Sequence, residues 1–409
     1  MKKSKLELKN FIWNIIGSTA FGFTSLFFMI IVTRINGLDK AGIFTYCFAN
    51  ACIFWTIASY SGRTFQVTES DENIKDTDYF YNRITTGVFS IIAVTVFCLL
   101  TKSTAEKFVL SLLLTIYRAI EAIIESMHAV VQRNGELYKA GISLFFRTII
   151  LVIAFIVVDL ITNNIIVTSG FLIVINLFFL FFIDYNNIKN KFNKSKFDSQ
   201  INKKLLHLGF STFLYSFLSI YVSSATKYAI NSFTTDDIQA IYGIIIMPAS
   251  FLSMVSNYLI QPFLNKISSS INNKDKKELN KLLIRLSLGI TFVGIMAIVL
   301  CYLIGIPILE FVYSTELKEQ KVNLLIILAG SIFYSLAILL SSAFIAMRKT
   351  MEQLILLIVT ALSALIISNQ FVKFWGINGA SISYLVVMFV EFALHFGTIL
   401  IILYQKEKK

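Results

Sequence analysis

Long apolar runs constrain this chain more than any other feature of its sequence. Hydrophobic residues make up 56% of the 409 residues and charged residues 15%, with a mean hydropathy of +0.74. A helix needs about 20 mostly apolar residues to cross a bilayer. Runs of that kind cover 11–32, 41–61, 84–101, 108–131, 140–158 and 165–183, then 205–226, 238–264, 282–304, 322–347, 352–372 and 376–404. Runs this long exclude strands, so we expect an all-α integral membrane protein with twelve transmembrane helices.

A basic stretch at 185–204 divides these runs into two groups of six. It reads YNNIKNKFNKSKFDSQINKK and carries six lysines, so it cannot cross a bilayer. We therefore expect two six-helix lobes, at 1–184 and 205–409, joined by a basic linker at 185–204. Short patterns repeat in the same order in both halves: DKAGIF at 39–44 matches DIQAIY at 237–242, and QRNGE at 132–136 matches MRKTME at 347–352. Such a parallel repeat is typical of transporters whose lobes rock around a central cavity.

The distribution of lysine and arginine predicts the orientation. If the N-terminus is cytoplasmic, 26 of the 36 cations fall in inside segments and seven in outside loops. Short loops rich in Lys and Arg stay on the cytoplasmic side. We therefore expect both termini and the linker in the cytoplasm. The segment KDKKELNKLLIRL at 274–286 has leucines at helical spacing and predicts an amphipathic helix on the inner surface.

Several classes of protein are excluded by what the sequence lacks. The net charge of +12 resides in loops, without the basic face and interleaved aromatic residues of a nucleic-acid-binding protein. The four cysteines fall inside apolar runs at spacings that suit neither disulfides nor a metal. Neither a Gly-x-x-x-x-Gly-Lys-Ser/Thr phosphate loop nor a His-Glu-x-x-His motif occurs. We expect no enzyme activity, no metal and no cofactor; energy would come from an H⁺ or Na⁺ gradient or from removal of product outside.

The fourth apolar run carries a stripe of polar residues. Arg118, Glu121, Glu125, His128 and Gln132 are spaced by three or four residues and therefore share one helical face. A charge inside a membrane is costly, so this face must meet protein or water, which makes its residues candidates for function. In the alternative interpretation, Arg118 and Glu121 or Glu125 only neutralise each other.

Other ionisable residues extend this candidate site. In the fifth run, Arg147 is either a partner of Glu121 or Glu125 or a substrate ligand, and Lys227 shares a face with hydroxyl side chains in the seventh. Arg34 and Arg63 complete the expected cationic set, although cations near span ends commonly reach to phosphate headgroups instead. Glu391 and His395, one turn apart, can exchange a proton or simply form an interhelical hydrogen bond. With Glu121 and Glu125 they are the expected coupling or charge-partner groups.

Three short segments resemble the MOP superfamily, in particular its Wzx-type O-unit flippases. They are TRINGLDKAGIFTY at 33–46, Gly62-Arg63 at the end of the second run, and GINGAS at 376–381. Physically, their small residues let helices approach closely. The drug-exporting MATE branch usually has ionisable and proline features in its N-terminal lobe. Here Pro248, Pro262 and Pro307 all lie in the C-terminal half. The lipid II flippase branch usually has fourteen spans, against the twelve expected here.

The resemblance implies a MOP/MATE-like fold and a flippase function. The implied substrate is an oligosaccharide on an undecaprenyl-diphosphate carrier, moved from the inner to the outer leaflet of the bacterial cytoplasmic membrane for O-antigen or capsule. A polysaccharide polymerase and a chain-length regulator are the implied protein partners. Two alternatives remain: a secondary exporter of small solutes, which shares this architecture, and a membrane-embedded polymerase or glycosyltransferase, which would usually carry a large outside loop.

Overall fold

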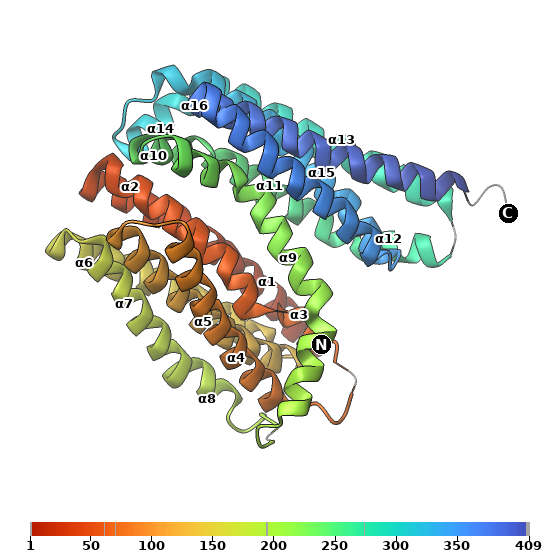
Figure 1. Cartoon of the computed structure of the whole chain (residues 1–409). Coiled ribbons are helices and arrows are strands. Elements are labelled where there is room, and N and C mark those ends of the chain that lie inside the picture. Colours follow the sequence, from red (N-terminus) through yellow and green to blue (C-terminus); the bar gives the residue numbers. More distant parts are fainter. Residues whose placement is uncertain (1, 61, 70, 194, 274, 406–409) are drawn as a thin grey trace. The chain divides into compact units, whose positions relative to one another are not determined.

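The computed structural model describes residues 2–60, 62–69, 71–193, 195–273 and 275–405 (Figure 1). All regular elements among them are helices, as predicted. Within this described part, nine helical segments are long and apolar enough to cross a membrane. The longest cover Lys5–Ser59 and Thr350–Ile402, 55 and 53 residues. At 1.5 Å per residue each would be about 80 Å long, far more than a bilayer of about 30 Å. The chain is a multi-pass membrane protein, and the count of twelve spans stays a prediction.

Single glycines interrupt both of the longest segments. Gly37 has φ 87° and ψ 177° inside the helix α2, and Gly376 has φ 53° and ψ −128° inside α16. Side-chain-bearing residues rarely adopt such positive φ values, and glycine does so without steric cost. Gly37 lies in the loop predicted between the first two apolar runs, and Gly376 is the first residue of the twelfth run, next to the short predicted loop at 373–375. A helical break therefore replaces a polar loop at each of these two positions.

The first unit groups residues Met1–Phe217 by their contacts. Its helices are α1 (Lys2–Gly22), α2 (Thr24–Ser59), α3 (Gly62–Val67), α4 (Asp76–Leu100), α5 (Ala105–Arg133), α6 (Leu137–Thr162), α7 (Ile165–Phe178), the π-helical turn η1 (Phe179–Asp184) and α8 (Tyr185–Ile188). Helix α5 packs against α2, α4 and α7, while α1 packs against α6 (Figure 1). The stripe-bearing helix is therefore the most enclosed of the unit.

Polar contacts gather the loops of this unit at two ends. At one end, Lys40 pairs with Glu106 at 2.7 Å, and Asn36 donates to Asn163 at 2.9 Å. These residues belong to loops expected outside. At the other end, loops expected inside meet one another. The contacts there join Asn10 to Gly135, Arg133 to Asp76, and Asp76 to Asn193. The predicted alternation of loops is confirmed for this unit, while the choice of cytoplasmic side stays a prediction.

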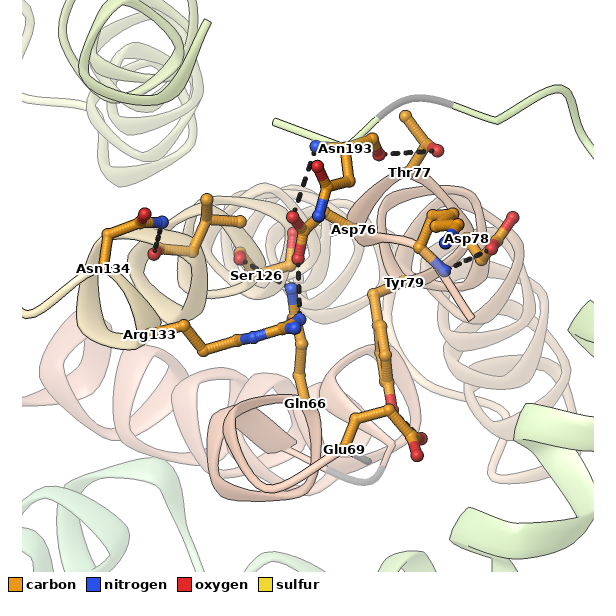
Figure 2. Close-up of polar contacts among 12 residues, drawn as sticks. Gln66, Glu69, Asp76, Thr77, Asp78, Tyr79, Ser126, Arg133, Asn134 and Asn193 are labelled. Atoms are coloured by element: carbon orange, nitrogen blue, oxygen red, sulfur yellow. Dashed lines mark hydrogen bonds and ion pairs between the residues drawn. The ribbon is translucent and has the colours of Figure 1, made fainter. Parts of the chain in front are cut away.

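The basic linker is fastened at this second end (Figure 2). The carboxylate of Asp76 accepts from the guanidinium of Arg133 at 3.1 Å and from the backbone N–H of Asn193 at 3.3 Å. The hydroxyl of Ser195 donates to Asp78 at 2.6 Å. Asp76 and Asp78 also begin α4, where negative charge favours the helix N-terminus. Two uncharged residues of the linker are thus held against the start of α4.

Helices α1 and α6 approach closely at two glycines. A Cβ on Gly17 would lie 2.3 Å from the carbonyl oxygen of Gly141, and a Cβ on Gly141 would lie 2.2 Å from that of Trp13. Small residues permit such backbone contact between membrane helices. Next to this crossing, the rings of Trp13 and Phe145 meet edge to face at 6.1 Å. The glycine pair sets how near Arg147, about one and two-thirds turns further along α6, lies to α1.

The second unit groups Leu218–Lys409, and the long helix α9 (Ser199–Phe233) passes from one unit into the other. Its other elements are α10 (Asp236–Ile245), α11 (Met247–Ile260), the 3₁₀ turn η2 (Gln261–Phe263), α12 (Leu264–Asn272), α13 (Lys276–Leu300), the π-turn η3 (Cys301–Gly305), α14 (Ile306–Tyr313), the 3₁₀ turn η4 (Lys318–Gln320), α15 (Lys321–Ala346) and α16 (Thr350–Gln405). Proline lies at the start of α11, in η2 and at the start of α14, because it lacks the N–H that a helix interior needs. The expected lobes at 1–184 and 205–409 stay a prediction.

The amphipathic segment before the ninth apolar run is not a separate surface helix, so that prediction is wrong. Residues Lys276–Leu300 form one continuous helix, α13. The leucines at 279, 282, 283 and 286 are buried against α15 in the core of the second unit. Helix α15 also packs against α16 (Figure 1). Helical spacing correctly identified an apolar face, but that face is covered by protein.

Candidate functional site

The candidate site is built on α5. The side chain of Thr104 accepts from the Lys107 amide and so caps the start of this helix, which then runs through to Arg133. Glu121 and His128 are 4% and 3% exposed, so the predicted stripe faces protein. A second face of α5 is apolar. Its residues, among them Ile120 and Ile124, contact α6, α7 and η1. The stripe and this apolar face together hold α5 in one rotation about its axis.

Glu121 lies at the centre of a buried charge cluster. Its Oε2 accepts from Nη1 of Arg118 at 2.7 Å, and its Oε1 lies 3.7 Å from Nη2 of Arg147. The hydroxyl of Tyr117 donates to the same Oε1 at 3.1 Å. Of the partners left open for Arg118 by the sequence, the structure selects Glu121 rather than Glu125. One carboxylate therefore faces two guanidinium groups, which leaves positive charge in excess.

Aromatic rings enclose the guanidinium of Arg118. Its Cζ lies 5.0 Å from the centre of the Phe48 ring and 5.7 Å from that of Phe21. Arg147 lies 5.8 Å from the Phe21 ring. Cations over aromatic faces are stabilised electrostatically, most strongly where water is excluded. Phe21 therefore lies against both arginines and holds them beside each other.

A small cavity lined by both ionisable and apolar side chains adjoins this cluster. Its volume is about 190 Å³, and its lining comprises Ser18, Phe21, Trp55, Arg63, Glu121, Glu125, His128, Leu144 and Arg147. A cavity of this size has room for several waters or for one phosphate-sized group. Nε and Nη1 of Arg147 and Oε2 of Glu125 are buried without a hydrogen-bond partner in the described part of the chain. Buried polar groups normally find partners, so these atoms indicate a place for water or an anion.

His128 has a partner that the sequence analysis missed. Its Nε2 lies 2.9 Å from Oδ1 of Asp184, and both side chains are nearly fully buried. Asp184 ends the π-turn η1, and wide turns of this kind inside helices are frequent at functional sites. In the sequence it falls between the sixth apolar run, which ends at 183, and the basic linker, which begins at 185. No periodic pattern in the sequence marks a π-turn, so the pairing of His128 with Asp184 could not be predicted from the sequence.

Arg83 was also misplaced by the sequence analysis, which counted it among loop cations. The structure places it inside α4 with 1% of its surface exposed. Nη2 donates to the carbonyl oxygen of Gly62 at 3.1 Å, while Nε and Nη1 have no hydrogen-bond partner in the described residues. Gly62 directly precedes the cavity residue Arg63. Arg83 therefore supports the backbone that presents Arg63.

Of the remaining predicted residues, one belongs to the first unit and three to the second. Arg34 is exposed beside the kink at Gly37 and does not line the cavity. Lys227 belongs to α9 in the second unit. Glu391 and His395 are buried on α16, where Nδ1 of His395 donates to the carbonyl oxygen of Glu391 at 2.8 Å. This hydrogen bond lies within one helix, so Nδ1 does not form the interhelical hydrogen bond that the sequence suggested. Among the described residues, none of the His, Cys, Asp and Glu groups has an arrangement suited to a metal ion.

No protein-family model matches the chain. A capsular polysaccharide biosynthesis protein, CapF of Staphylococcus aureus, is 21% identical over 391 residues, which cover 94% of this chain and 96% of that protein. Among solved structures, the lipid II flippase MurJ in an inward closed conformation aligns with a TM-score of 0.70 and 16% identity, over 96% of this chain and 87% of MurJ. An inward-facing multidrug resistance MATE transporter of the MOP superfamily aligns with a TM-score of 0.70 and 11% identity, over 97% and 99% of the two chains. The resemblance seen in the sequence is confirmed: this chain has the fold of the MOP superfamily.

Proposed function

We propose that this chain is a flippase rather than an enzyme. It would move an oligosaccharide linked to undecaprenyl diphosphate from the cytoplasmic to the outer leaflet of a bacterial cytoplasmic membrane, by alternating access of two lobes. The fold supports a transporter, and the similarity to a capsular polysaccharide biosynthesis protein supports a polysaccharide precursor as cargo. The substrate and the membrane lipids are the binding partners in this proposal, together with a polymerase and a chain-length regulator.

The observation that carries the proposal is the excess positive charge around the cavity. Arg63 and Arg147 line the cavity together with Glu121 and Glu125, and Arg118 pairs with Glu121 beside it, so three arginines accompany two carboxylates. A diphosphate is the part of the proposed substrate that such a site attracts, because arginine pairs strongly with phosphate oxygens. The cavity is too small for an oligosaccharide, so the sugars would lie outside it.

The geometry suggests different roles for the arginines. Arg63 and Arg147 line the cavity, and Arg147 has two donor nitrogens without partners, so these two are the proposed anion contacts. Arg118 is held by Glu121 and by Phe48, which suits a positioning residue. Lys227 and Arg34 remain proposed contacts for other parts of the substrate's path. An H⁺ or Na⁺ gradient would supply energy, with Glu125, Glu391 and His395 as candidates for proton exchange.

The test is flipping of a fluorescent diphosphate-linked oligosaccharide in proteoliposomes, detected by an enzyme that trims only exposed sugars. Removing a charge-assisted hydrogen bond costs about 1.5–3 kcal/mol, so Arg147→Met should slow flipping about 10- to 100-fold. Arg147→Lys keeps the charge without the planar fork and should retain part of the rate. Arg348→Met, at an exposed position that follows α15, is the matched control and should flip normally.

A double variant separates positioning from binding. If Arg118 acts only through Glu121, replacing both in Arg118→Met/Glu121→Leu should restore much of what either single change loses. If Arg118 binds substrate itself, the double variant stays inactive although it folds. Export of small cationic dyes by the wild-type protein, without any flipping of the diphosphate-linked sugar, would overturn the proposal in favour of a small-solute exporter.

A further inference from the structure

The second unit has an apolar groove with a cationic end, which we call the α13 groove. Its volume is about 550 Å³, and it runs between α13, α15 and α16. Lys276 and Lys277 line it at the first turn of α13, and Leu283, Leu288, Phe396 and Ile399 line its apolar part. Ile284 and Leu288 are 61% and 66% exposed, so one side of the groove is open. Pockets of this size hold drug-sized ligands, here one with a long apolar part and an anionic end.

The length of the groove matches one leaflet. Lys276 and Thr291 mark its ends on α13, and the 15 residues between them rise about 22 Å. Half of a hydrocarbon core is about 15 Å thick, so the groove covers that depth and the adjoining headgroup layer. The lysines then lie at headgroup level, and Thr291 lies near the bilayer midplane. A chain that fits this groove ends within a single leaflet.

Charge favours an anionic occupant. Besides Lys276 and Lys277, the exposed side chains of Lys281 and Arg285 follow on the same helix. Two acids lie nearby: Glu278 is 3.6 Å from Lys266, which offsets its charge, and Asp275 caps the start of α13 by accepting from the Glu278 amide. Lysines near a membrane surface attract anionic lipids, each contributing measurably to binding. The cationic end of the groove is therefore suited to a lipid phosphate with a net negative charge.

We propose that the α13 groove is a binding site for an anionic phospholipid of the cytoplasmic leaflet. The phosphate contacts Lys276 and Lys277, and one acyl chain lies along Leu283, Leu288, Phe396 and Ile399. A polyisoprenyl carrier is much longer than one leaflet and fits the observed length less well. This proposal concerns the second unit alone and does not rest on the function proposed above. Its occupant would stabilise α13 against α15 and α16.

The test uses the full chain with tryptophan placed at Leu288, in vesicles of brominated phosphatidylglycerol or brominated phosphatidylcholine. Bromine on the acyl chain quenches tryptophan within contact distance. Quenching at Leu288→Trp, corrected for the native tryptophans, should favour phosphatidylglycerol about tenfold in apparent affinity. Ile355→Trp, at an exposed position in the first turns of α16 and outside the groove, should show no preference.

Two charge variants complete the design. Lys276→Gln/Lys277→Gln should abolish the preference for phosphatidylglycerol at Leu288→Trp, while Lys189→Gln/Lys196→Gln removes the same charge from the linker and should leave it intact. Equal quenching by both lipids at Leu288→Trp would overturn the proposal. Displacement of the bromolipid by undecaprenyl phosphate, but not by phosphatidylglycerol, would also overturn the proposal and identify the polyisoprenyl carrier as the ligand of the groove. Quenching that falls as protein concentration rises would overturn it in favour of a second copy of the chain.

Discussion

The crossing of α1 and α6 permits a sharp prediction about Gly141→Ala. The new Cβ would lie 2.2 Å from the carbonyl oxygen and 2.4 Å from the carbonyl carbon of Trp13, where ordinary contact begins at 3.4 Å. Both neighbours are backbone atoms and cannot rotate away. The two helices must therefore separate by about 1 Å, because packed interiors have little free volume.

The cost follows from what that separation disturbs. Overpacking by one methyl group costs about 1–3 kcal/mol. Separation also loosens the edge-to-face contact of Trp13 with Phe145 and the bonds of Asn10 to Gly135 and Tyr138. We expect Gly141→Ala to destabilise the protein by about 2–3 kcal/mol, at the upper end of that range. Gly17→Ala should act through the same separation, so the double variant should cost less than the sum of the two.

Thermal unfolding in detergent, followed by tryptophan fluorescence at one fixed scan rate, measures the effect. Gly170→Ala in α7 is the matched control. A Cβ there meets nothing within 4 Å, and alanine favours a helix over glycine by about 1 kcal/mol. That variant should unfold at the same temperature as the parent or higher. If Gly141→Ala unfolds no earlier than Gly170→Ala, the close approach of the two backbones is refuted.

Three further predictions concern the first unit and the orientation of the chain. Asp184→Asn should keep a hydrogen bond to His128 with little loss of stability, whereas Asp184→Leu should leave the ring unpaired and lower the unfolding temperature. The hydrogen bond from Lys204 lowers the pKa of Asp71 from 3.8 to about 2, so the ion pair persists above about pH 4 and is lost as the pH falls through about 2. Lys204→Met should return the titration midpoint of a ¹³C-labelled Asp71 carboxyl toward 4, and an unchanged midpoint would contradict the assignment. A single cysteine in place of the exposed residue Lys196 or Asn272 should react with an impermeant maleimide from the cytoplasm. A single cysteine in place of the exposed residue Thr104 should react from outside. Ser270 is buried and therefore unsuitable as a reporter.

Much of the fold was predictable because the bilayer leaves few choices. The length of the apolar runs predicted the helices. The alternation of loops between the two ends of the first unit followed from the order of these runs along the chain. Gly37 illustrates the limit: the sequence predicted a loop between two spans, and the structure makes that turn with one glycine inside a helical run. The leucines after Lys276 illustrate another. Their spacing defined an apolar face, but spacing alone does not tell whether lipid surface or α15 covers it.

The site was predictable where it follows a single helix. The stripe from Arg118 to His128 lies on one face of α5, so period alone brought its members together. The partners from other helices were only partly accessible: Arg147 was foreseen as a partner of Glu121 or Glu125 because its helix is the antiparallel neighbour of α5. Asp184 and Arg83 were missed because their burial depends on a π-turn and on the packing of α4. Tertiary contact, not local pattern, decides those positions.

The π-turn at Phe179–Asp184 has a consequence for comparing this chain with its relatives. An α-helix advances about 100° per residue, and a wide turn accommodates one residue more than a regular turn of the same helix. Helical-wheel counting carried across η1 is therefore wrong by one position and would rotate Asp184 away from His128. A relative shorter by one residue in this stretch would keep the carboxylate on the same face with a regular helix. An alignment should place its gap inside 179–184, and a one-residue deletion there is the length change that this helix tolerates best.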